Sequence, residues 1–169
     1  MSQDFNEASV PDQSGRTILV TGANTGIGYE AARVLAGRGA RVLLGCRSTV
    51  KARDARERIC ALHPKAKVEL LSLDLGNLQS VREAADEVSR EARLDLLINN
   101  AGIMVPPREE TADGFESQFG VNHLGHFALT GLLLEKLLAT PGSRVVNVSS
   151  GTGAGPAGIQ GNTCTRGWN

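Results

Sequence analysis

T-G-A-N-T-G-I-G, residues 21–28, joins a β-branched apolar run at residues 17–20 to a segment at 29–35 whose apolar residues have helical spacing. The pattern predicts a buried strand, a tight turn and a helix. Glycines let a backbone turn tightly and approach a ligand, and the first free N–H groups of a helix attract an anion. The spacing is not that of a P-loop. By itself the stretch leaves a phosphate-binding turn and an ordinary α/β turn equally open.

Short apolar runs alternate with amphipathic segments along most of the chain. Strands are expected at residues 17–20, 41–46, 68–73, 94–99 and 145–148, and helices at 29–35, 49–62, 77–88 and 115–138. We expect Ser48 and Asn77 to cap the second and third helices. The alternation predicts an α/β fold in which right-handed crossovers wind a parallel sheet. The expected architecture is a Rossmann-type doubly wound sheet that is incomplete, with about five strands.

Three segments differ in character. Residues 1–15 are polar, which is typical of a flexible leader. Residues 16–150 carry the alternating pattern and form the expected single domain. Residues 151–169 are rich in glycine and follow neither the strand nor the helix period. We expect this last segment to be a disordered tail outside the domain, because it cannot bury much apolar surface.

Composition excludes several classes of function. The 18 basic and 18 acidic residues balance, and without a basic stripe a nucleic-acid partner is not expected. The three cysteines are far apart, so neither a disulfide framework nor a zinc site is indicated. The longest apolar region, residues 127–138, is interrupted by polar and charged side chains, and the first 15 residues lack the pattern of a signal peptide. We therefore expect a cytoplasmic protein without a membrane span.

Seven sequence blocks occur in a fixed order. They are T-G-A-N-T-G-I-G at 21–28, G-C-R at 45–47, D-L at 74–75, N-N-A-G at 99–102, D-G-F-E at 113–116, V-N-H-L-G-H-F at 121–127 and R-V-V-N-V-S-S at 144–150. With these blocks the chain resembles the short-chain dehydrogenases/reductases, and within them the retinol-dehydrogenase-like group. The resemblance covers about four-fifths of the chain.

The resemblance implies a dinucleotide cofactor at the carboxyl ends of the strands, where open α/β sheets bind ligands. The pyrophosphate would lie against the glycine turn, whose expected contributors are Thr21, Gly22, Asn24, Gly26, Ile27 and Gly28. Asp74 would contact the adenine, with the backbone of Leu75 alongside. The adenine ribose would lie along Asn100, Ala101 and Gly102.

The end of the second strand indicates which dinucleotide is bound. Position 46 is a cysteine, where an NAD enzyme of this family would place an acid for the ribose 2′-hydroxyl, and Arg47 follows. The planar, permanently charged arginine suits a 2′-phosphate. We therefore expect NADP in preference to NAD.

The resemblance also implies a reaction: transfer of a hydride between nicotinamide and a small carbonyl or alcohol substrate. In the family a Tyr serves as general acid or base, and a Lys four residues later lowers its pKa. Ser150 matches the serine that binds the substrate oxygen, and Asn122 matches the asparagine that anchors a proton-relay water. The only tyrosine is Tyr29, and all the lysines precede Ser150. Without the Tyr-x-x-x-Lys pair we expect this chain, as given, to be inactive.

Two alternatives to an oxidoreductase stay open. One is a non-catalytic dinucleotide-binding protein that keeps only the cofactor half of the family's site. The other is a fragment in which the residues after Ser150 come from a shifted reading frame or an alternative junction. A Tyr-x-x-x-Lys recovered in another frame of the coding DNA would distinguish the second.

Two further patterns lie in the fourth helix. His123 and His126 are three residues apart, but no third ligand follows at metal-site spacing, so we expect a structural role and no metal. A run of leucines follows at Leu132, Leu133, Leu134, Leu137 and Leu138. We expect these leucines to form a core face or the contact of a homo-oligomer.

Overall fold

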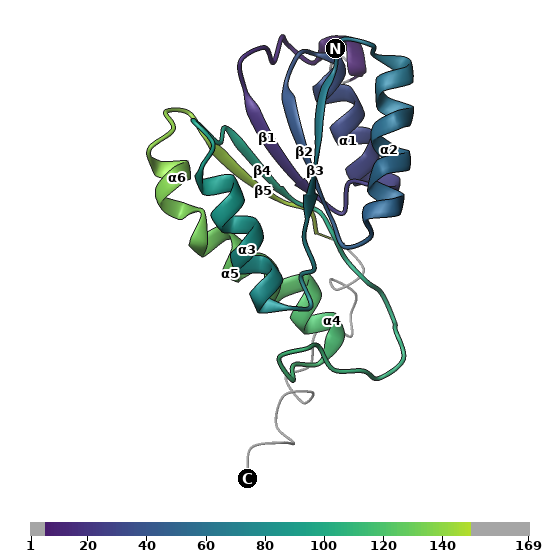
Figure 1. Cartoon of the computed structure of the whole chain (residues 1–169), viewed down its shortest axis with the longest axis vertical. Coiled ribbons are helices and arrows are strands. Elements are labelled where there is room, and N and C mark those ends of the chain that lie inside the picture. Colours follow the sequence, from purple (N-terminus) through teal and green to yellow (C-terminus); the bar gives the residue numbers. More distant parts are fainter. Residues whose placement is uncertain (1–5, 150–169) are drawn as a thin grey trace, which may run out of the picture.

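The computed structural model describes residues 6–149. Five parallel strands form one sheet in the order β3-β2-β1-β4-β5 (Figure 1). The strands are β1 (Thr17–Thr21), β2 (Arg41–Cys46), β3 (Lys67–Ser72), β4 (Leu96–Asn99) and β5 (Arg144–Asn147). The helices are η1 (Glu7–Ser9), α1 (Gly26–Gly37), α2 (Thr49–Leu62), α3 (Leu78–Ser89), α4 (Ser117–Phe119), η2 (Gly120–Leu124), α5 (Gly125–Leu132) and α6 (Leu134–Leu138). The expected doubly wound parallel sheet is confirmed.

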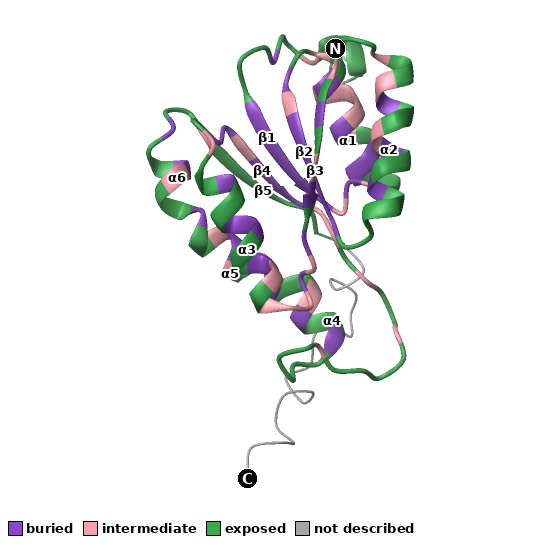
Figure 2. Ribbon diagram, in the orientation of Figure 1, coloured by how far each residue is buried: buried purple, intermediate pink, exposed green. Residues whose placement is uncertain are grey.

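Helices cover both faces of the sheet. Helices α1 and α2 pack on one face, and α3, α5 and α6 pack on the other (Figure 1). Two apolar cores result, and β1, β2 and β4 between them are largely buried, whereas β5 at the sheet edge is exposed (Figure 2). The first core contains Ile18, Val20, Val42, Leu44 and Ile59, and the second contains Leu19, Leu43, Leu97, Leu129 and Leu133. Alternate residues of one strand thus enter opposite cores, as the period of two in a strand requires.

Strand register brings the sequence blocks together at the carboxyl edge of the sheet. Thr21 pairs with Gly45, and Val20 pairs with Ile98. Cys46 pairs with Ser72 on the next strand. The segments that follow β1, β2, β3 and β4 therefore leave the sheet side by side.

The single long helix expected at residues 115–138 is wrong in two respects. It begins at Ser117, because the Glu116 side chain caps it by accepting hydrogen bonds from the N–H groups of Gln118 and Phe119, both at 2.7 Å. Its second turn, η2, is a π-helix, and α5 ends before Leu133. Apolar spacing cannot reveal a π turn, because such turns are rare single-turn insertions in an otherwise regular helix.

The leucine run divides between two environments. Leu133 and Leu137 are buried in the second core, whereas Leu132, Leu134 and Leu138 are 48%, 49% and 76% exposed. A core role is therefore confirmed for the first two. Association of copies through the exposed leucines stays a prediction.

The expected flexible leader is ordered from Asn6 onward. Asn6 caps η1, and Glu7 forms an ion pair with Arg33 of α1. The backbone N–H of Gln13, a buried residue, donates to the carbonyl of Arg38 at 2.8 Å. These contacts hold the segment against the domain. Over residues 6–149, no helix has both the length and the apolarity needed to cross a bilayer.

Candidate functional site at the carboxyl edge of the sheet

Two glycines in the turn between β1 and α1 lie too close to neighbouring atoms to carry a side chain. Gly22 has a φ of +65°, and a Cβ atom there would lie 2.9 Å from the Cα of Ala101. A Cβ at Gly28 would lie 2.3 Å from the Asn100 amide nitrogen and 2.7 Å from the carbonyl oxygen of Gly22. No other residue fits either position without displacing the neighbouring β4 turn.

The amino end of α1 has no side-chain cap. Thr25, its N-cap residue, makes no capping hydrogen bond. By contrast, Ser48 caps α2 by accepting from the Lys51 N–H, and Asn77 caps α3 in the same way. Thr25, Gly26 and Ile27 are also exposed, Ile27 by 71%. The first N–H groups of α1 and its positive end are thus free to bind an anionic group.

The Thr21 hydroxyl joins the glycine turn to the turn after β4. Its Oγ1 accepts hydrogen bonds from the N–H groups of Asn100 at 2.9 Å and Ala101 at 3.0 Å. In addition, the Asn100 side-chain nitrogen donates a hydrogen bond to the Thr21 carbonyl at 2.9 Å. Both segments expected to bind the cofactor are therefore held in a fixed relation.

Asn122 holds the next part of the β4 turn. Its side-chain oxygen accepts from the Ile103 N–H at 2.9 Å, and its side-chain nitrogen donates to the Ile103 carbonyl at 2.8 Å. A Cβ at Gly102 would be in ordinary contact with the Asn122 amide. The structure thus shows Asn122 as a clamp on this turn, and its expected role toward a relay water stays a prediction.

Asp74 lies at the third strand end, half-buried. Its Oδ1 accepts from the Gly76 N–H at 2.9 Å, and its backbone N–H donates to Ser80 at 3.0 Å. The carbonyl of Leu75 packs against α5, where a Cβ at Gly125 would lie 2.4 Å from that oxygen. These bonds fix Asp74 in the turn between β3 and α3, and its contact with adenine stays a prediction.

The second strand ends in a buried thiol and an exposed arginine. Cys46 is 3% exposed, and burial raises the pKa of its thiol, although the N–H groups of Ala23 and Asn24 in the glycine turn act in the opposite direction. Arg47 is exposed at the start of the β2–α2 connection, and its guanidinium makes no ion pair with any residue in 6–149. It is therefore available to an anionic ligand.

Sequence reasoning missed one contributor to the glycine turn. Arg58 of α2 donates to the Asn24 carbonyl at 3.2 Å and lies over the Tyr29 ring, 4.2 Å from its centroid. It also forms an ion pair with Asp54. Arg58 is 11 positions beyond the G-C-R block, and no local pattern separates it from the other charged residues of α2. Only the packing of α2 beside α1 brings it to the turn.

The other residues singled out in the sequence are Ser150 and the two histidines. Ser150 lies outside the described residues, as does the expected tail. His123 is exposed and stacks with Phe119 at 5.2 Å between ring centroids. Both ring nitrogens of His126 contact protein groups, Thr21 and the Asn122 carbonyl. The contacts of His126 fit the expected structural role. Within residues 6–149 no three potential metal ligands cluster, and the expected absence of a metal stays a prediction.

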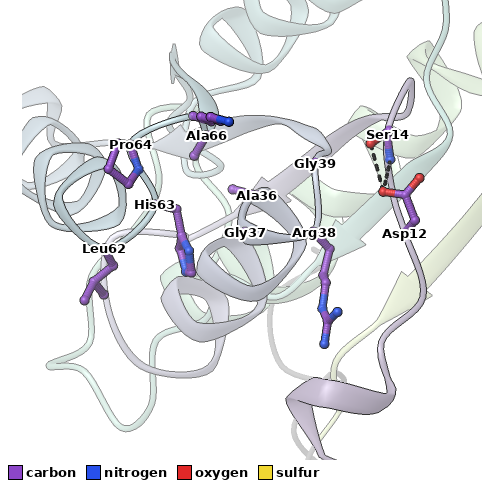
Figure 3. A pocket seen from close by; sticks show the side chains of 11 residues that line it. Asp12, Ser14, Ala36, Gly37, Arg38, Gly39, Leu62, His63, Pro64 and Ala66 are labelled. Atoms are coloured by element: carbon purple, nitrogen blue, oxygen red, sulfur yellow. Dashed lines mark hydrogen bonds between the residues drawn. The ribbon is translucent and has the colours of Figure 1, made fainter.

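A cavity of about 650 Å³ lies away from this edge (Figure 3). Its lining includes Asp12 and Ser14, which precede β1, and Gly39, which precedes β2. His63 lies in its wall, at the end of α2. These residues mark the amino end of the sheet, so the cavity has no part in the glycine-turn site.

A doubly wound parallel sheet with a glycine turn between its first strand and first helix is the architecture of a Rossmann domain. A sequence profile of the short chain dehydrogenase family matches residues 16–162. The chain therefore belongs to the short-chain dehydrogenase family. The match runs to residue 162. It therefore extends past Ser150, the residue at which the sequence pattern predicts the end of the domain.

Relatives confirm the resemblance to the retinol-dehydrogenase-like group. The chain is 50% identical to retinol dehydrogenase 13 of Homo sapiens over 146 residues, which cover 86% of this chain. It is 53% identical to retinol dehydrogenase 11 of Mus musculus over 137 residues, which cover 80% of this chain. In each case the match spans 43% of the relative, so the chain covers less than half of their length.

A solved structure supports the fold. The crystal structure of a short chain dehydrogenase from Escherichia coli, complexed with NADPH, superposes with a TM-score of 0.74. That protein is 32% identical to this chain, and the match covers 86% of this chain and 64% of the other.

Proposed function

We propose that this chain binds NADP along the carboxyl edge of its sheet. The chain would form the cofactor-binding part of an oxidoreductase that transfers a hydride between nicotinamide and a small carbonyl or alcohol substrate. When bound, NADP supplies or accepts the hydride, and the residues of this edge bind and orient the cofactor. The names of the two relatives make a retinoid alcohol and aldehyde one candidate substrate pair.

The observation that carries the proposal is the glycine cradle joined to the β4 turn. A side chain at Gly22 or Gly28 would collide with Ala101 or Asn100 of the β4 turn, so these two glycines allow the two turns to lie close together, and the uncapped end of α1 faces the same turn. The Thr21 hydroxyl holds the β4 turn beside this cradle. These are the features that a dinucleotide requires.

Arg47 supports the choice of NADP over NAD. The 2′-phosphate is the group that distinguishes the two cofactors, and the Arg47 guanidinium, which has no ionic partner among residues 6–149, is suited to it. The buried thiol of Cys46 offers no carboxylate to a free 2′-hydroxyl. A cytoplasmic location likewise stays a prediction from sequence.

Replacement of Arg47 tests cofactor choice. We expect R47A to weaken NADPH binding about 10- to 100-fold, because a charge-assisted hydrogen bond contributes ~1.5–3 kcal/mol, and to leave NADH binding nearly unchanged. Fluorescence titration of the full chain with each cofactor measures this. The matched control is R53A, which removes an exposed arginine of the neighbouring helix α2 and should alter neither affinity. Equal affinity of the unchanged protein for NADPH and NADH would contradict the assignment.

A further inference from the structure

His126 lies beneath the cofactor-binding edge, although none of the expected cofactor contacts involves it. It is 7% exposed, on the first turn of α5. Its Nε2 is 2.9 Å from the Thr21 Oγ1, and its Nδ1 is 3.0 Å from the carbonyl oxygen of Asn122. The imidazole therefore bridges β1 and the π turn.

Hydrogen-bond accounting determines which nitrogen carries the proton. A backbone carbonyl can only accept, so Nδ1 must donate to Asn122. In the neutral ring Nε2 is then an acceptor, and the Thr21 hydroxyl donates to it. The two lone pairs of Oγ1 remain for the N–H groups of Asn100 and Ala101. Every polar atom in this chain of contacts then has a partner.

Protonation of His126 would disturb this arrangement. Nε2 would become a donor, and three N–H groups would then compete for one hydroxyl oxygen with two lone pairs. The Thr21 proton would be left with the Ile98 carbonyl at 3.4 Å, which is a long contact. Either the ring or the β4 turn must then move.

The surroundings of His126 also favour the neutral ring. Burial lowers its pKa, the hydrogen bond to Asn122 partly opposes that effect, and the electrostatic influence of His123 lowers the pKa further. The facing groups of β1 and the β4 turn, Thr21, Asn100 and Ala101, carry no ionisable group. The neutral ring therefore contributes stability that is present above the unfolded pKa of about 6.5 and is lost as pH falls through the folded value.

We propose that His126 is a positioning residue: its neutral Nδ1–H tautomer holds the Thr21 hydroxyl as the acceptor for the Asn100 and Ala101 N–H groups. It thereby sets the β4 turn for the ribose and couples the Asn122 clamp to the glycine turn. This proposal rests on the proposed function only in its last step, cofactor binding. The hydrogen-bond arrangement itself can be tested without cofactor.

The first experiment uses the full chain without cofactor. Nitrogen NMR of the histidines should show His126 neutral at neutral pH, with Nδ1 protonated and Nε2 as acceptor. H126L removes the acceptor and should speed hydrogen exchange at Asn100 and Ala101. H126Q can accept at the former Nε2 position without titrating and should preserve their protection. An Nε2-protonated neutral ring, or unchanged exchange in a folded H126L, would overturn the proposal.

The second experiment measures NADP⁺ affinity against pH. H126L should weaken binding about tenfold, which corresponds to ~1.4 kcal/mol. Binding by the unchanged protein should fall as His126 becomes protonated, and binding by H126Q should not. The titration of the cofactor phosphate affects the unchanged protein and H126Q equally, so the difference between their pH profiles reports on His126. H123Q, which alters the exposed histidine, should still show a pH dependence, with its midpoint shifted upward because His123 lowers the pKa of His126. An identical pH profile in H126Q would overturn the proposal.

The two experiments also separate this proposal from the proposed function. If tautomer and exchange behave as expected but no NADP⁺ binds, the cofactor assignment fails and the role of His126 in positioning the turn stands. If H126L does not fold, the tautomer of the unchanged protein and the H126Q comparison still decide the question.

Discussion

G28A is expected to lose about 100-fold or more in NADPH affinity. The added methyl group would lie 2.3 Å from the Asn100 amide nitrogen and 2.7 Å from the Gly22 carbonyl, and the second of these is backbone that cannot turn aside. To relieve the first of these two close contacts, the Asn100 side chain must move, and this movement breaks its hydrogen bond to the Thr21 carbonyl. Two displaced polar contacts at ~1–2 kcal/mol each account for the loss. Fluorescence titration with NADPH measures it.

Two alanine variants serve as controls for G28A. Gly131 lies in α5 with nothing within 4 Å of a built Cβ, so G131A should bind NADPH normally and be slightly more stable. At Gly26 the Cβ also has space, but φ is +58°, so G26A should show an intermediate loss from backbone strain alone. Circular dichroism shows whether each variant is folded. Normal NADPH binding by folded G28A would argue against the glycine cradle as the pyrophosphate site.

A polypeptide of these 169 residues is expected to bind NADPH but to show no oxidation of it above background with a small aldehyde or with retinal. The family's proton donor is a Tyr assisted by a Lys four residues later, and the sequence contains no such pair. Tyr29 cannot replace it, because it is 8% exposed and lies beneath Arg58. General acid catalysis contributes about 10²- to 10⁴-fold to a rate.

The assay follows the absorbance of the reduced nicotinamide, with NADPH affinity measured on the same preparation. The affinity measurement is the control, because it separates a chain that binds without turning over from one that does not bind. Steady NADPH consumption that depends on the carbonyl compound would refute the prediction.

Much of the fold followed from local patterns. The β-branched runs and their amphipathic neighbours predicted every strand to within two residues, and the Ser48 and Asn77 caps were predicted correctly. These features depend on residues close together in the chain, so sequence carries them. The helix at residues 115–138 was less predictable, because it is interrupted by a π turn that apolar spacing does not reveal.

The candidate site divides in the same way. The T-G-A-N-T-G-I-G stretch and the strand-end positions of Arg47 and Asp74 can be identified from sequence, because strand ends in a parallel sheet share one edge. The contribution of Arg58 could not be predicted from the sequence, because it arises from the packing of α2 beside α1.

By itself, the sequence determined the class of fold, the glycine turn and the family, because these are written in short blocks of adjacent residues. Only the tertiary structure decided how the glycine turn is held. The Thr21 hydroxyl meets the β4 turn 79 residues away and His126 105 residues away, and such contacts leave no periodic signal in the chain. They exist because the parallel sheet places β1 beside β4 and α5 packs beneath both.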